Sequence, residues 1–279
     1  MELLPFLLAF ALAGTAVAIW LGVRKSRRRR TLLSKSLPEE WRKILEQEFP
    51  RFVSMPAEIQ KSVEGITQVL MSEKNFEPCG ELEQVTDRMK LLISAQAALL
   101  LAKLEKHNYY GKLKSILVYP TAFRDGGHRR FGLHDEDESG TRLGESWQTG
   151  SVILSWESVI SGAKNADDGM NVVIHEFAHQ LDQNDGAGDG VPILHDRNAY
   201  RQWAKVFSKN YKELVSEVED GKGNRSLIDP YGATNPAEFF AVASETFFEE
   251  STQLLREYPD LYQELKHYYQ LDPAHWQTT

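Results

Sequence analysis

The chain has 279 residues and a formal net charge of −8 at pH 7, which argues against nucleic acid as a direct partner. Its single cysteine, Cys79, excludes an internal disulfide and agrees with a reducing compartment. Residues 35–279 are enough for one domain with a substantial hydrophobic core.

The N-terminus begins with an apolar stretch, residues 3–23, that carries no charge and would be about 31 Å long as a helix. Six Lys and Arg side chains follow at once in residues 24–30. A cleaved signal peptide would carry its positive charges before the apolar run. The order therefore predicts a transmembrane helix (3–23), a basic juxtamembrane segment (24–34) that contacts lipid headgroups, and a single-pass location in the inner (cytoplasmic) membrane with residues 35–279 in the cytoplasm.

Periodicity in the remaining chain predicts an α+β domain that is mostly helical, with a small sheet. The acidic run 135–138 lacks the spacing of a calcium loop and is expected to be a solvated loop. The strand at 151–156 could be an internal strand or an edge strand that pairs with another backbone. The expected helices cover residues 39–47, 56–71, 85–104, 198–218, 236–249 and 259–269, and the expected strands cover 115–119 and 151–156.

The most informative motif is His175-Glu176-Phe-Ala-His179, inside an apolar run with the turn signals of a helix at both ends. In a helix, His175 and His179 lie one turn apart on the same face, where two imidazoles can bind one zinc ion. Glu176 would lie beside the ion as a base for the attacking water. A buried helix with these polar groups is costly unless a metal coordinates them.

A third ligand is expected from the segment at 229–245. Asn235 is a plausible N-cap and Pro236 fits the first helical position, so Glu238 falls in the first turn of the next helix. Glu245 lies on the same face two turns later and competes as a ligand. We expect Glu238 to bind the metal and Glu245 to accept a hydrogen bond from a histidine ring.

A different third ligand, Asp185, follows from metzincin-type spacing. That arrangement needs a glycine three residues after the second histidine, where this chain has Asp182. It also needs a methionine turn below the site, yet all five methionines precede the motif. The metzincin arrangement is therefore rejected.

Four segments resemble the Mlc titration factor A family of zinc peptidases: residues 92–101, 116–120, the stretch that contains the HExxH motif, and the IDPYGATNPAEFF stretch. The resemblance spans residues 35–275. It implies a zincin-like fold, one Zn²⁺ per chain held by His175, His179 and Glu238, and an aminopeptidase-type activity. It also implies a gluzincin-like site similar to that of anthrax lethal factor, in which Tyr231 would stabilise the oxyanion.

The sequence therefore predicts a membrane-anchored zinc peptidase that hydrolyses peptide or protein substrates, with Glu176 and Tyr231 as catalytic residues. The alternative is a regulatory protein that binds a transcriptional repressor, because the family takes its name from capture of the repressor Mlc. Glu176 favours catalysis, since a purely structural zinc site does not need a base beside it.

Overall fold

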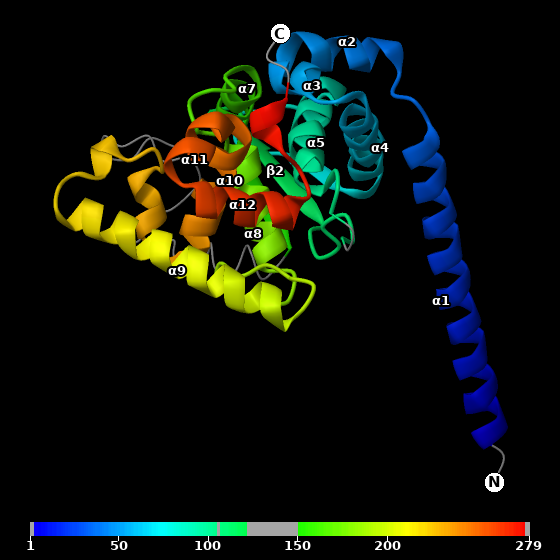
Figure 1. The fold of residues 1–279 in the computed structure, drawn as a ribbon. Coiled ribbons are helices and arrows are strands. Elements are labelled where there is room, and N and C mark those ends of the chain that lie inside the picture. Colours follow the sequence, from blue (N-terminus) through cyan, green and yellow to red (C-terminus); the bar gives the residue numbers. More distant parts are fainter. Residues whose placement is uncertain (1–2, 105–106, 122–149, 277–279) are drawn as a thin grey trace.

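The structure, a computed structural model, describes residues 3–104, 107–121 and 150–276. Figure 1 shows a helical body from which the first helix projects. Short 3-10 turns lie at Gly223–Arg225, Pro230–Ala233 and Pro273–His275. The α-helices are α1 (Leu3–Ser34), α2 (Glu39–Glu48), α3 (Pro50–Ser54), α4 (Ala57–Glu73), α5 (Asp87–Leu101), α7 (Trp156–Lys164), α8 (Val172–Asp182), α9 (Arg197–Glu219), α10 (Pro236–Glu249), α11 (Ser251–Glu257) and α12 (Pro259–Tyr269).

The described sheet has three parallel strands in the order β1 (Asn75–Pro78), β2 (Ser115–Tyr119) and β3 (Ser151–Ser155). Alternate side chains of β2 and β3 are buried, so one face of the sheet packs on the body. Within the described residues, β3 lies at the edge of the sheet and next to α8. The buried strand residues are Ile116, Val118, Val152 and Leu154.

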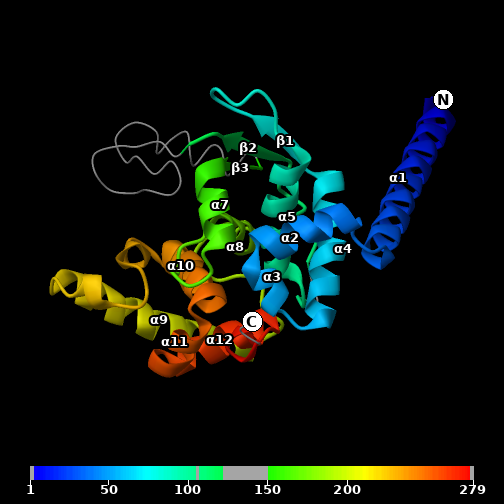
Figure 2. The same ribbon diagram turned by 90° about the horizontal axis from the view of Figure 1, so that it is seen from above.

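Helix α5 forms the centre of the core. Every residue from Leu91 to Leu101 is buried, because α4, α7 and α8 all pack against this helix. Thr86 caps it by accepting a hydrogen bond from the main-chain N–H of Met89. Figure 2 shows α5 and α8 between the sheet and the C-terminal helices. The core therefore encloses the HExxH helix from several sides.

The expectation of a mostly helical domain with a small sheet is confirmed. The expected helices and strands agree with the structure to within a few residues, whereas β1, α3, α7 and α11 were not expected. The strand expected at 151–156 ends at Ser155, because the Ser155 hydroxyl accepts a hydrogen bond from Ser158 N–H and caps α7. The acidic run 135–138 lies outside the described residues.

The predicted transmembrane helix is wrong, and with it the predicted single-pass location in the inner membrane. Among the described residues, no helix combines the length and the apolar character that crossing a bilayer requires. The apolar stretch is only part of α1, which continues without a break through the basic residues 24–30 to Ser34. The predicted lipid contacts of the basic segment have no support from this arrangement.

The basic half of α1 packs against α4 instead. The Arg29 guanidinium donates two hydrogen bonds of 2.7 Å to the Glu73 carboxylate and lies 4.4 Å from the centre of the Tyr109 ring. Lys25 Nζ adds a second contact to Glu73 at 3.2 Å. The basic segment, read from sequence as a flank for lipid headgroups, therefore attaches α1 to the body through an ion pair.

Candidate metal centre

Helix α8 presents the two histidines of the motif. Asn171 caps its N-terminus, because the side-chain oxygen accepts hydrogen bonds of 3.1 Å from the N–H groups of Val173 and Ile174. His175 and His179 lie one turn apart, with ring centroids 4.9 Å from each other. Both histidines are buried, so the polar face of α8 points into the protein.

Helix α10 brings Glu238 to the same place. As expected, Asn235 caps this helix by accepting a hydrogen bond from Glu238 N–H at 3.0 Å, and Pro236 lies at its start. Glu238 is buried, although the first turn of a surface helix usually exposes its carboxylates. Helices α8 and α10 pack directly against each other, which places this side chain against the two imidazoles.

Three donor atoms converge at the contact between these helices. Glu238 Oε2 lies 3.1 Å from His175 Nε2 and 3.3 Å from His179 Nε2, and the two Nε2 atoms are 3.2 Å apart. Ligand atoms about 2.0–2.1 Å from a tetrahedral zinc ion would be about 3.3 Å from one another. The triangle therefore has the size that a zinc ion requires. In the part of the chain that the structure describes, no other group of three His, Cys, Asp or Glu side chains converges in this way.

The orientation of His175 also suits a metal ligand. Its Nδ1 lies 2.7 Å from Glu245 Oε1, so this carboxylate can accept a hydrogen bond from Nδ1–H, an arrangement that would leave Nε2 available to bind a metal ion. The predicted pairing of Glu245 with a histidine is thus confirmed.

The charges at the centre favour a cation. Burial by itself would lower the pKa of His175, but Glu245 and Glu238 together raise this pKa well above its ordinary value. Burial would likewise raise the pKa of Glu238, yet its contacts with both histidines lower it far below the usual range. These carboxylates therefore stabilise a positive charge between the rings, whether a proton or a metal ion carries it.

The two candidate catalytic residues lie beside the three donors. Glu176 follows His175 on α8 and is buried, and burial raises the pKa of its carboxyl above the ordinary value. Tyr231 lies in the 3-10 turn before α10, where Asp229 accepts its N–H at 2.8 Å, and its ring is 6.1 Å from that of His175. The structure thus brings both residues to the cluster.

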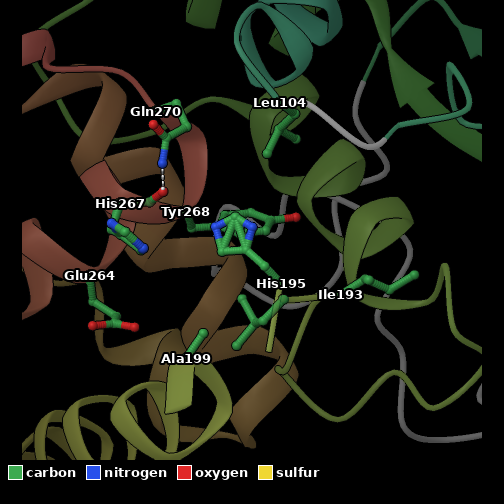
Figure 3. Close-up of a pocket in the computed structure, with 9 residues that line it drawn as sticks. Leu104, Ile193, His195, Ala199, Glu264, His267, Tyr268 and Gln270 are labelled. Atoms are coloured by element: carbon green, nitrogen blue, oxygen red, sulfur yellow. Dashed lines mark hydrogen bonds between the residues drawn. The ribbon is translucent and has the colours of Figure 1, made fainter. Parts of the chain in front are cut away.

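Asp185, the rejected metzincin-type ligand, and the histidines outside the motif were not expected to bind the metal. Asp185 is exposed and accepts the N–H of Ala187, so it is not part of the cluster. His195 lies 5.8 Å from His267, ring to ring, in a pocket that none of the three donors lines (Figure 3). His128 and His134 lie outside the described residues.

Three residues around the site were not identified from sequence: Gln96, Asn171 and Glu249. In the sequence, the acidic residues before Gly169 indicate the start of α8, but the residue that caps this helix is Asn171. An Asn directly before the first apolar residue is itself a cap signal and could have identified this residue. No pattern in the sequence marks Gln96 or Glu249, because their importance comes from contacts between distant segments.

Comparison with known proteins adds an independent finding. Residues 23–270 match the family described as glucose-regulated metallo-peptidase M90. The chain is 40% identical over 251 residues to an uncharacterised Synechocystis protein, slr2042, and the match covers 88% of this chain and 89% of the relative. It is 31% identical over 207 residues to Mlc titration factor A of Serratia proteamaculans (73% and 77% covered), and 30% identical over 230 residues to that of an Enterobacter strain (80% and 83% covered).

The family match covers most of the chain, including all the residues of the cluster. A buried group of two histidines and a glutamate agrees with the metal dependence that the family description states. The chain therefore belongs to the glucose-regulated metallo-peptidase M90 family.

Proposed function

We propose that this metallopeptidase is a zinc enzyme in which His175, His179 and Glu238 hold one Zn²⁺. The observation that carries the proposal is the triangle of donor atoms, with sides of 3.1–3.3 Å, next to a buried carboxylate. Two imidazoles and one carboxylate are the donor set of many catalytic zinc sites, which leave one position open. When bound, zinc would act as a Lewis acid that polarises the scissile carbonyl and lowers the pKa of water.

The residues of the chain would share the remaining steps. Glu176 accepts a proton from the attacking water and passes it to the nitrogen of the leaving amine as the peptide bond breaks. Burial raises the pKa of this carboxyl, which makes it a stronger base for the proton of the water. The Tyr231 hydroxyl donates to the oxygen on which negative charge develops. Glu245 keeps the His175 ring in the tautomer that a metal needs.

Peptide or protein chains are the proposed substrates. Among the described strands β3 lies at the edge of the sheet and beside α8, which supports main-chain pairing between this strand and an extended substrate. The finer proposal is cleavage from the amino end, as the family resemblance implies. Matched peptides with a free or an acetylated N-terminus test it, because an aminopeptidase would cleave only the free form.

The central experiment measures the metal content and peptidase activity of the purified full-length chain. We expect about one zinc per chain, loss of activity on chelation, and recovery when zinc is added back. Activity that is unchanged after the metal has been removed would contradict the proposed mechanism.

A second candidate function comes from the relatives named Mlc titration factor A. Their name supports binding of a repressor protein by this chain as well. Calorimetric titration with a purified Mlc-type repressor tests it, and Glu176→Gln separates the two functions. Repressor binding should survive this change, whereas peptidase activity should not.

A further inference from the structure

Asn171 makes more contacts than a helix cap requires. Only its side-chain oxygen serves the cap, while its side-chain amide and main-chain N–H face two carboxylates of α10. The main-chain N–H donates to Glu245 Oε2 at 2.6 Å, and Nδ2 donates to Glu249 Oε1 at 3.0 Å. Asn171 is 1% exposed, so neither contact competes with water.

The same amide reaches two further helices. Nδ2 lies 2.9 Å from Gln96 Oε1 of α5 and 3.1 Å from the main-chain oxygen of Gly162 in α7. Gln96 is itself fixed, because its Nε2 donates to the Leu92 carbonyl at 3.1 Å. One buried side chain therefore joins α5, α7 and α10 to the start of α8.

Gly162 shows that this contact is close. A Cβ atom on Gly162 would lie 2.9 Å from Asn171 Cγ and 3.0 Å from Nδ2, which is too short for packed atoms. A glycine within a helix costs roughly 1 kcal/mol relative to alanine. The close approach to Asn171 gives a physical reason for this glycine.

These contacts bear on the metal centre because its donors come from two helices. His175 and His179 belong to α8, whereas Glu238 belongs to α10. Glu245 and Glu249 are one turn apart on α10, and both are held by Asn171, four residues before His175. Two points of attachment fix both the distance between the helices and their relative position along the axis.

We propose that Asn171 is a positioning residue of the metal centre: it holds Glu245 and Glu249 so that Glu238 and the two histidines meet at one ion. This inference rests on the proposed zinc site. It differs from a capping role in one testable respect. A cap needs only the side-chain oxygen, which serine also supplies. The contact with Glu249 needs the side-chain amide, which serine lacks, whereas the main-chain contact with Glu245 remains in both residues.

The test compares Asn171→Ser with Thr86→Ala, a loss of cap on α5 away from the site. The readouts are zinc affinity, measured by competition with a chelator, and the visible absorption spectrum of Co²⁺, which reports the geometry of its ligands. We expect Asn171→Ser to weaken zinc binding about 10–100-fold and to change the Co²⁺ spectrum. Thr86→Ala should lower the melting temperature and leave both metal readouts unchanged.

A second pair of variants gives an answer even if Asn171→Ser does not fold. Glu249→Gln keeps an oxygen that can accept from Asn171, so its metal readouts should match those of the wild type. Glu249→Ala removes that oxygen and should change both readouts. If the wild type binds Co²⁺ but Asn171→Ser and Glu249→Ala keep its spectrum and zinc affinity, Asn171 is only a cap and the inference is wrong. A wild type that binds no metal would instead overturn the zinc site itself.

Discussion

In soluble proteins apolar side chains are usually buried and polar ones exposed, but the metal centre and the first half of α1 show the opposite. At the centre, His179 is 1% and Glu238 is 3% exposed, although both are polar. On α1, Leu12 is 68% and Trp20 is 58% exposed, although both are apolar. Figure 1 shows the reason for α1, whose N-terminal end projects away from the body.

The difference shows that the burial of a side chain depends on the neighbouring groups that it contacts, and not only on its own polarity. The two histidines and Glu238 can be buried because each histidine lies within hydrogen-bond distance of a carboxylate. The same holds for the second half of α1, where the charged Arg29 is half-buried against Glu73. Substitutions that remove one of these contacts at a time therefore test the comparison between the two regions. The first of them removes Glu238, the third donor of the metal centre.

Glu238→Ala should have the largest effect. It removes the carboxylate donor of α10, so the two histidines alone would not hold zinc, and metal binding should be lost. Glu245→Ala is the matched control on the same helix and should bind zinc only about 10–100-fold more weakly. Metal content after dialysis distinguishes them. The reverse pattern would make Glu245 the ligand.

Glu176→Gln should keep the fold and the metal and lose about 10²–10⁴-fold in kcat, since the amide cannot accept the proton of the attacking water. Steady-state kinetics together with metal analysis checks this expectation. Turnover close to that of the wild type would remove Glu176 from the mechanism and favour the binding function.

Tyr231→Phe removes one hydroxyl beside His175 and should cost about tenfold to a thousandfold in kcat, with zinc content unchanged. The ring remains, so packing against His175 should be preserved. A rate equal to that of the wild type would show that Tyr231 serves packing and not the oxyanion.

Arg29→Met should have the smallest effect, about 1–2 kcal/mol in the free energy of unfolding, because it breaks a half-buried ion pair. Burial alone would raise the pKa of Glu73, but Arg29 and Lys25 lower it below its ordinary value. The pair is therefore stabilising above the ordinary pKa of a glutamate, and this contribution is lost as the pH falls through the lowered value.

Denaturant unfolding at several pH values measures this contribution. The difference between the wild type and Arg29→Met should shrink at acidic pH, where Glu73 becomes protonated. Arg28→Met, at an exposed position of the same helix, is the control and should have little effect at any pH. A difference that does not depend on pH would show that Arg29 stabilises through packing alone.

Much of the site could be predicted because the positions of its residues depend on patterns within short stretches of sequence. The i, i+4 spacing of the two histidines fixes their common face once the segment is helical, and the Asn-Pro signal before Glu238 fixes where α10 begins. The α1 helix shows the opposite case. The apolar run and the basic cluster that follows it favoured a membrane span. The contact between the basic half of α1 and α4 depends on Glu73, which is 44 residues from Arg29 in the chain.

The sequence by itself determined most of the longer helices, the start signal of α10 and the pair of histidines, because each of these depends on residues within a turn or two. Only the tertiary structure decided that Glu245 orients His175 and that Asn171 joins α8 to α10, because these contacts link segments about 70 residues apart. Their geometry depends on how the helices pack around α5, and packing is a property of the whole core.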